Sequence, residues 1–216
     1  MELSDYLRIL RQRGWVVLVM AVLTAVATFG FSKMQTEVYE SNLKLLVRPA
    51  RTDYGQSQAS RELLGSYEQW LNSSYRAQAV INILQLDMTA QDLMGNFSVA
   101  SDRLALVLQL AVENTDPDLA NDMARTWGEL LIQWQNQENE KNRQEDRITI
   151  ELQDDPLASL VQPKTKINTA AGGVFGVILG LVVIFVLEWI ESGVVRRSED
   201  IERYLDIPVI GQIPNQ

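Results

Sequence analysis

The chain has 216 residues, of which 46% are apolar, and a formal net charge of −9 at pH 7, with neither Cys nor His. These counts exclude a disordered chain, a Cys-ligated zinc site, a disulfide framework and every Ser-His or Cys-His catalytic dyad. A pI near 4.6 argues against nucleic-acid binding, which requires clustered Lys and Arg to neutralise phosphates.

The first apolar block is an uncharged run of 18 residues from Gly14 to Phe31. A helix needs about 20 such residues to cross a hydrocarbon core of about 30 Å, so the run predicts a transmembrane helix over 14–32. Trp15 lies at one end, as an interfacial anchor would. The alternative is a cleaved signal peptide, because three arginines precede the run and Ala25-Val26-Ala27 resembles a small-residue cleavage site.

The next segments predict strand, loop and helix in turn. Residues 39–47 partly alternate in polarity and stop at Arg48-Pro49, which is typical of a strand. The polar stretch 50–59 is interpreted as a loop. Over 60–86 the apolar residues recur every three or four positions, which predicts a helix that is broken near 72–74.

Three further signals follow in the middle of the chain. Thr89, with an acidic residue three positions later, predicts a short capped helix. Residues 96–100 and 104–112 are interpreted as two strands, the second apolar enough to be central in a sheet. Asp116-Pro117 has the cap and first-turn proline that open a long helix.

That long helix predicts a core-facing stripe made of Leu119, Met123, Trp127, Leu130, Leu131 and Trp134. From 135 to 146 it becomes almost wholly polar, so we expect this part to project into solvent or to line a subunit contact. Residues 147–152 alternate again, as a returning strand does. The predicted fold class is therefore α+β: a small mixed sheet packed with helices, one of them long.

The second apolar block is an uncharged run of 20 residues from Asn168 to Leu187, which predicts a transmembrane helix over 168–190. Glycines recur in it at four-residue spacing, and such a stripe lets another helix approach closely. The partner is either the first span or a neighbouring subunit; the alternative is the general abundance of glycine in membrane helices. The candidate packing residues are Gly172, Gly173, Gly176 and Gly180.

Arginines near the outer flanks of both spans place both termini in the cytoplasm by the positive-inside rule, although Lys33, Lys164 and Lys166 on the opposite flanks weaken the signal. The sequence thus predicts a two-pass protein with one large extracytoplasmic domain. Its parts are a cytoplasmic segment at 1–13, the first span at 14–32, the extracytoplasmic domain at 33–167, the second span at 168–190 and a cytoplasmic tail at 191–216.

The order of these features resembles the chain-length determinant family, the polysaccharide co-polymerases of bacterial inner membranes. Residues 2–20 are similar to the family's Arg-containing segment before the first span. Residues 36–49 resemble its first periplasmic strand, and residues 96–131 its strand, strand, Asp-Pro and helix run. The resemblance covers nearly the whole chain, and its weight lies in the order and spacing of these pieces.

The family resemblance implies a homo-oligomeric inner-membrane scaffold without catalysis, acting in exopolysaccharide or capsule production. It implies partners in the polysaccharide polymerase or export machinery, the nascent polysaccharide and the lipid bilayer. From composition and motifs we expect no nucleic acid, no cofactor, no metal and no catalytic residue. The chain's departures are a partial proline-rich stretch before the second span, with only Pro156 and Pro163, and the lack of a long coiled-coil arm.

The tail resembles the juxtamembrane segment that leads toward the kinase domain in relatives associated with bacterial tyrosine kinases. The sequence contains no G-x-x-x-x-G-K-[ST] phosphate loop, so the resemblance implies a separate tyrosine kinase docked on this tail. The alternative is a tail that only caps the helices at the membrane. The residues assigned to kinase contact are Arg196, Arg197, Ser198, Glu199, Asp200, Ile207, Pro208, Val209, Ile210, Gly211 and Pro214.

Two other function classes fit the sequence less well. A membrane-anchored sensor would need an outer pocket with convergent polar groups, and the sequence points to none. A hydrolase would need two opposed carboxylates or a nucleophile motif, whereas Asp154-Asp155 and Glu199-Asp200 are adjacent pairs typical of solvated loops. Trp70, Trp127 and Trp134 are candidates for stacking on sugar rings, but Trp127 and Trp134 lie seven residues apart on one helical face and are interpreted as core or subunit interface.

Overall fold

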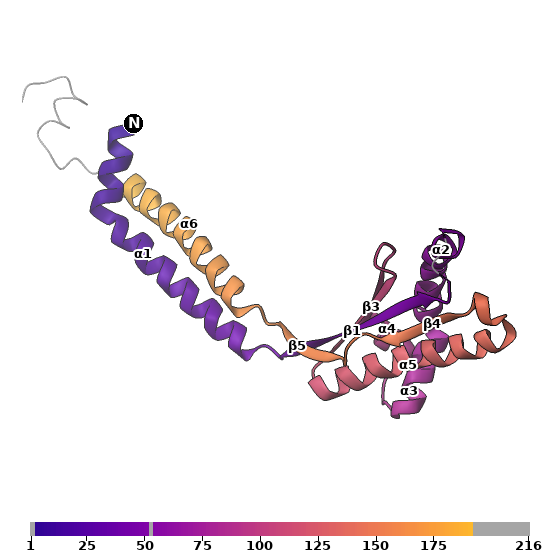
Figure 1. Cartoon of the computed structure of the whole chain (residues 1–216). Helices are drawn as coiled ribbons and strands as arrows, with labels where there is room; N and C mark the ends of the chain where they lie inside the picture. The colour runs from indigo at the N-terminus through magenta and orange to yellow at the C-terminus, as the bar shows by residue number, and fades with distance from the viewer. Residues whose placement is uncertain (1–2, 52–53, 192–216) are drawn as a thin grey trace, which may run out of the picture. The chain divides into compact units, whose positions relative to one another are not determined.

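The computed structural model describes residues 3–51 and 54–191 of the chain (Figure 1). It divides into two compact units, one holding the two terminal helices and the other formed by Thr36–Pro163. Each unit has its own reason to be compact: the first packs two apolar helices together, and the second encloses a hydrophobic core between a sheet and helices.

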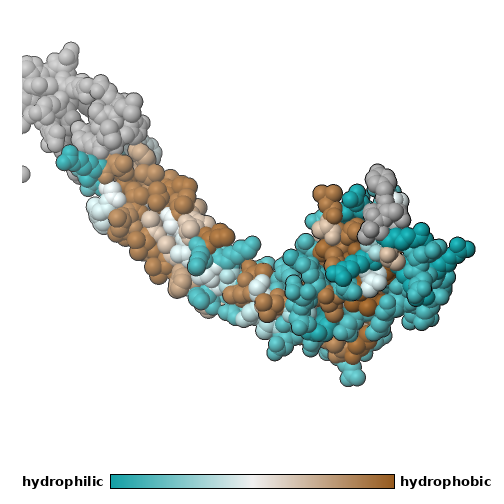
Figure 2. Space-filling view, in the orientation of Figure 1, coloured by the Kyte–Doolittle hydropathy of each residue, from teal (hydrophilic) through white to brown (hydrophobic). Residues whose placement is uncertain are grey.

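The first unit is a hairpin of α1, Leu3–Met34, and α6, Thr165–Glu191. The two helices pack side by side (Figure 1). By length and composition, both can cross a membrane, over Leu10–Met34 and Thr165–Ile190. Apolar side chains cover much of the hairpin surface (Figure 2), as expected of helices that face lipid.

The second unit is built on an antiparallel sheet of five strands in the described chain. The central strand β1 pairs with β3 along one edge, and on its other edge β5 pairs with its first half and β4 with its second half. Strand β2 extends the sheet beyond β3. The strands are β1, Val38–Pro49; β2, Phe97–Asp102; β3, Val107–Asn114; β4, Ile148–Leu152; and β5, Leu157–Gln162.

Helices supply the other half of the core. They are α2, Tyr54–Leu71; α3, Ser74–Leu84; α4, Ala90–Gly95; and α5, Pro117–Lys141, followed by the 3-10 turn Gln144–Asp146. Alternate residues of β1, including Leu43 and Leu45, are fully buried, and α5 packs against this strand. Trp127 of α5 stacks on Phe97 with ring centroids 3.9 Å apart, and its indole N–H donates to the carbonyl of Leu71 at 3.2 Å.

Most of the predicted elements are confirmed. The long helix begins after Asp116, whose carboxylate accepts from two first-turn N–H groups, and Thr89 forms a complete capping box with Asp92. The predicted break near 72–74 separates α2 from α3. The coarse fold class, a mixed α+β chain with an antiparallel sheet and two apolar terminal helices, is also confirmed.

Four details of the prediction were wrong. The segment 50–59 is not all loop, because α2 begins at Tyr54. Strand β5 was not predicted, and the strand placed at 104–112 begins only at Val107, because the carboxylate of Asp102 accepts from two backbone N–H groups and forms a turn. The sheet is not mixed, because every strand pairing in the described chain is antiparallel.

Candidate functional site

Three of the four predicted packing glycines lie against α1. A Cβ atom built on Gly172 would lie 2.7 Å from Cγ2 of Thr28, and one on Gly176 would lie 2.6 Å from the carbonyl oxygen of Met20. One on Gly180 would lie 2.6 Å from Cα of Val17. All three are separated by four residues, so they face α1 as one line on α6.

Gly173 lies at the margin of this contact. A Cβ atom there would meet only the Cβ of Ala25, at the ordinary distance of 3.8 Å. Beyond the glycines the same line continues to Ile184, which is 1% exposed. The helix contact therefore runs along most of α6 and consists of small residues where the two backbones come closest.

Several polar side chains of the hairpin form hydrogen bonds within it. The hydroxyls of Thr24 and Thr28 donate to carbonyls four residues earlier, each at 2.8 Å, so they carry no unpaired donor into the helix contact. Near the end of α1, Ser32 is 1% exposed and receives a hydrogen bond from Nδ2 of Asn168 at 3.1 Å. Ser32 also donates to the hydroxyl of Thr165 at 3.3 Å, which ties the two helices together at this end.

The two prolines of the pre-membrane motif bracket β5. Pro156 is buried in the turn between β4 and β5, and Pro163 directly follows β5 before α6 begins. Since proline cannot donate to a strand ladder, this placement limits β5 to six residues. The assigned kinase-contact residues of the tail all lie outside the described part of the chain.

The aromatic residues divide between core and surface. Trp127 is fully buried, whereas Trp70 and Trp134 are half-buried with ring centroids 5.1 Å apart. The Arg76 guanidinium lies 3.8 Å from the centroid of the Trp70 ring, a cation–π contact. This guanidinium occupies one face of the Trp70 ring.

A buried polar chain connects α2, α5 and β4. The hydroxyl of Tyr67 donates to Oε1 of Gln135 at 2.9 Å, and Nε2 of Gln135 donates to Oδ1 of Asn139 at 3.1 Å. Asn139 in turn exchanges two hydrogen bonds with the backbone of Ile148, at 2.7 and 3.1 Å. Burial raises the pKa of Tyr67 to about 12, which keeps the phenol neutral as a donor.

The acidic pair Asp154-Asp155 lies on an exposed turn, where Asp155 pairs with Arg125 at 3.0 Å. Within residues 3–51 and 54–191, no cluster of three or more acidic side chains is arranged to hold a metal ion. This geometry agrees with the interpretation of these carboxylates as surface groups.

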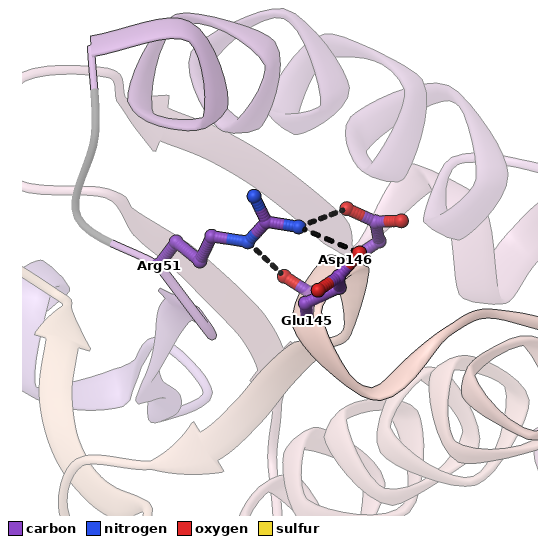
Figure 3. Close-up of polar contacts among 3 residues, drawn as sticks. All are labelled: Arg51, Glu145 and Asp146. Carbon is purple, nitrogen blue, oxygen red and sulfur yellow. Dashed lines mark hydrogen bonds and ion pairs between the residues drawn. The ribbon is translucent and has the colours of Figure 1, made fainter.

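Sequence reasoning did not anticipate an ion cluster at the far end of β1. Arg51, just past β1, reaches the 3-10 turn and pairs with the carboxylates of Glu145 at 3.1 Å and Asp146 at 3.4 Å (Figure 3). Its Nε also donates to the Glu145 carbonyl at 3.2 Å. The partners are 94 and 95 residues apart in the chain, so no local motif could have indicated them.

Comparison with known proteins adds the family context. The family model described as "Wzz: Chain length determinant protein" matches residues 1–108. The chain is 26% identical to the capsular polysaccharide biosynthesis protein CpsC of Streptococcus pneumoniae, over 99% of this chain and 94% of that protein. It is 24% identical to YwqC of Bacillus subtilis, named as a probable capsular polysaccharide biosynthesis protein, over 98% of this chain and 87% of that protein.

Proposed function

The chain belongs to the chain length determinant family, and we propose on this basis that it is a non-catalytic scaffold for polysaccharide production. In this proposal it regulates the polymerisation, chain length and export of an exopolysaccharide or capsule. The observation that carries the proposal is the family match, which is supported by relatives named for capsular polysaccharide biosynthesis that cover nearly the whole chain.

In the proposed topology, α1 and α6 cross the bacterial inner membrane. Both termini are cytoplasmic, and the domain built on the antiparallel sheet lies outside. The length and apolar composition of the two helices support the crossing, and the arginines at 8–13 and 196–203 support the orientation. The proposed boundaries remain 14–32 and 168–190 for the spans and 33–167 for the outer domain.

The glycine line of α6 is proposed to hold the two spans of one chain together. Close backbone approach at Gly172, Gly176 and Gly180 supports this role, since helices in lipid associate through van der Waals contact at small residues. Contacts between subunits of the proposed homo-oligomer then use other surfaces, because this line is already covered by α1.

The cytoplasmic tail is proposed to engage and regulate a separate bacterial tyrosine kinase. The support is the resemblance of residues 198–214 to the juxtamembrane segment of kinase-associated relatives, with Pro208 and Pro214 favouring an extended chain. Residues 194–216 would thus couple the outer assembly to a cytoplasmic enzyme.

The experiment that tests the scaffold is the size distribution of surface and secreted polysaccharide, compared on one gel between cells with and without the gene. We expect polymer to be lost or its modal length to shift, and a plasmid copy should restore the original profile. An unchanged profile, with the protein shown to be expressed in the parent, would refute the scaffold and favour the membrane-anchored sensor.

The tail is tested with a chain truncated after Glu191. Self-association, measured by chemical cross-linking in membranes, should persist, because the helices and the outer domain are intact. Co-purification of the tyrosine kinase should be lost relative to the full chain expressed at the same level. Kinase recruitment that survives the truncation would refute the tail assignment.

A further inference from the structure

We propose that a surface hollow in the domain Thr36–Pro163 binds a neutral, hydroxyl-rich saccharide unit. The hollow has a volume of about 430 Å³ and lies where α2, the 3-10 turn and β4 meet. This volume falls in the range of small-ligand sites, roughly 300–1,000 Å³. Its lining includes Arg51, Ala59, Ser60, Leu63, Asp146 and Ile148.

One side of the hollow carries charged hydrogen-bonding groups. The Arg51 guanidinium and the Asp146 carboxylate both line it, 3.4 Å apart, and the Glu145 carboxylate lies 3.1 Å from the same guanidinium (Figure 3). The three side chains are between 46% and 58% exposed, so a ligand can reach them. An ionised carboxylate only accepts hydrogen bonds and a guanidinium only donates them.

A second, independent observation at the same place is the hydroxyl of Ser60. Ser60 is fully buried and lines the hollow, and its Oγ has no hydrogen-bond partner within the described residues. Buried polar atoms in native proteins rarely lack a hydrogen-bond partner, and each exception needs an explanation, such as an absent ligand or water. This oxygen has less than 1 Å² of exposed surface, so a ligand hydroxyl would become its partner only once the Ser60 side chain rotates toward the hollow.

The remaining wall is apolar. Leu63 of α2 and Ile148 of β4 line the hollow, Ile148 being 7% exposed, together with the exposed methyl group of Ala59. Such a surface fits the C–H face of a sugar ring, which has apolar character between its hydroxyls. Apolar walls with a few placed polar groups are the usual make-up of a small-molecule site.

These groups select for hydroxyls over other ligand chemistries. The Arg51 guanidinium only donates hydrogen bonds, the Asp146 carboxylate only accepts them, and the Ser60 hydroxyl does both. A ligand hydroxyl can pair with each of the three because it both donates and accepts. One guanidinium faces two carboxylates, so the local charge disfavours an anion. No group of three acidic side chains in the described chain is placed to hold a cation. The inference rests on the proposed function, which would bring polysaccharide to this domain.

The test uses the purified full-length chain in detergent and free sugars as probes: glucose, galactose, N-acetylglucosamine, maltose and lactose. Saturation-transfer NMR identifies the sugars that bind, and titration gives their affinities. Ala59→Trp fills the hollow from an exposed position, and Asp146→Asn removes one carboxylate charge. The matched control is Arg125→Gln, which breaks another exposed ion pair, Arg125–Asp155, outside the hollow.

We expect at least one of these sugars to bind, at least tenfold more weakly to Ala59→Trp and Asp146→Asn, and with unchanged affinity to Arg125→Gln. Unchanged thermal unfolding of the variants would show that the loss is local. The inference is overturned if none of the sugars binds the full chain, if Ala59→Trp binds as well as the parent, or if sodium sulfate or calcium chloride displaces the sugar.

The failure of this site and the failure of the proposed function are distinguishable. A gene deletion that shifts polymer length, in a protein that binds none of the sugars, overturns the site and leaves the scaffold standing. If the purified parent chain binds a sugar that Ala59→Trp does not bind, but deletion of the gene leaves the polymer profile of the cells unchanged, the site is supported and the scaffold is refuted.

Discussion

Close backbone approach in the helix hairpin gives a sharp prediction for Gly176→Ala. Its new Cβ would lie 2.6 Å from the Met20 carbonyl oxygen and 2.7 Å from Cα of Ala21, whereas ordinary contacts begin at 3.4 Å. The helices must therefore separate locally by about 0.8 Å, the difference between 3.4 and 2.6 Å. Overpacking of this kind typically costs about 1–3 kcal/mol.

The chain has no Cys, so a single engineered pair can report this separation. Ala25→Cys with Gly173→Cys places two Cβ atoms 3.8 Å apart, the mean spacing in disulfides. When the double-cysteine chain is equilibrated in membranes with a mixture of reduced and oxidised glutathione, the fraction that forms the disulfide gives the effective concentration of the two thiols. Gly176→Ala should lower it by about fivefold or more, with roughly 150-fold as the upper bound from 3 kcal/mol.

The matched control is Gly30→Ala, the same substitution in α1 at a position where a Cβ would meet nothing within 4 Å. It carries the same change in helix propensity without the clash, so its effective concentration should equal that of the parent pair. Equal values for Gly176→Ala and Gly30→Ala would refute close packing of α6 on α1.

Further predictions concern the domain Thr36–Pro163 and are all checked by unfolding of the full chain in detergent. Burial raises the pKa of Tyr67 to about 12 in the folded chain, against about 10 in the unfolded chain. The neutral phenol therefore contributes to the free energy of unfolding, and this contribution is fully present below about pH 10. Roughly 2 kcal/mol of stability should then be lost between about pH 10 and pH 12, and Tyr67→Phe should lack this part of the alkaline decline. Gln135→Leu should cost about 1–3 kcal/mol, because it leaves the Tyr67 hydroxyl without its acceptor, whereas Gln133→Leu at an exposed neighbouring position should change little. Thr89→Ala should cost about 1 kcal/mol through its capping box; a variant as stable as the parent chain would contradict this.

Sequence patterns predicted the elements whose signal is local. Asp116-Pro117 and Thr89 mark helix starts by backbone chemistry that operates within three residues. The core stripe of α5 follows from helical spacing, and Met123, Trp127 and Leu131 are fully buried as expected. Trp134, predicted on the same stripe, is only half-buried because it lies toward the end of the helix, against Trp70.

The missed elements lack such local signals. The first turns of α2 contain few apolar residues, so no helical periodicity is visible before 60, although Gln and Ala favour a helix. Strand β5 has exposed residues on both faces, including Leu157 at 77%, and its sequence shows no alternation that could identify a strand. Its formation depends on pairing with β1, more than 110 residues earlier.

Long-range pairing also explains what could not be predicted of the candidate site. The glycine spacing in α6 indicated a packing face, but two partners were possible, and only the fold places α1 opposite it. The hollow beside Arg51 draws its lining from α2, the 3-10 turn and β4. No spacing rule connects these segments, so the sequence offered no pocket to consider.

The pairing of Val38 with Gln162 at the open ends of β1 and β5 makes the domain between the helices behave as an insert. Strand β1 follows α1 and strand β5 precedes α6, and these two strands are hydrogen-bonded to each other. The residues between them can therefore be exchanged by altering only the two neighbouring junctions, α1–β1 and β5–α6. Duplication, enlargement or replacement of this middle segment would leave the sequence of the paired helices untouched. Modules of very different size could therefore be carried on the same two-helix base.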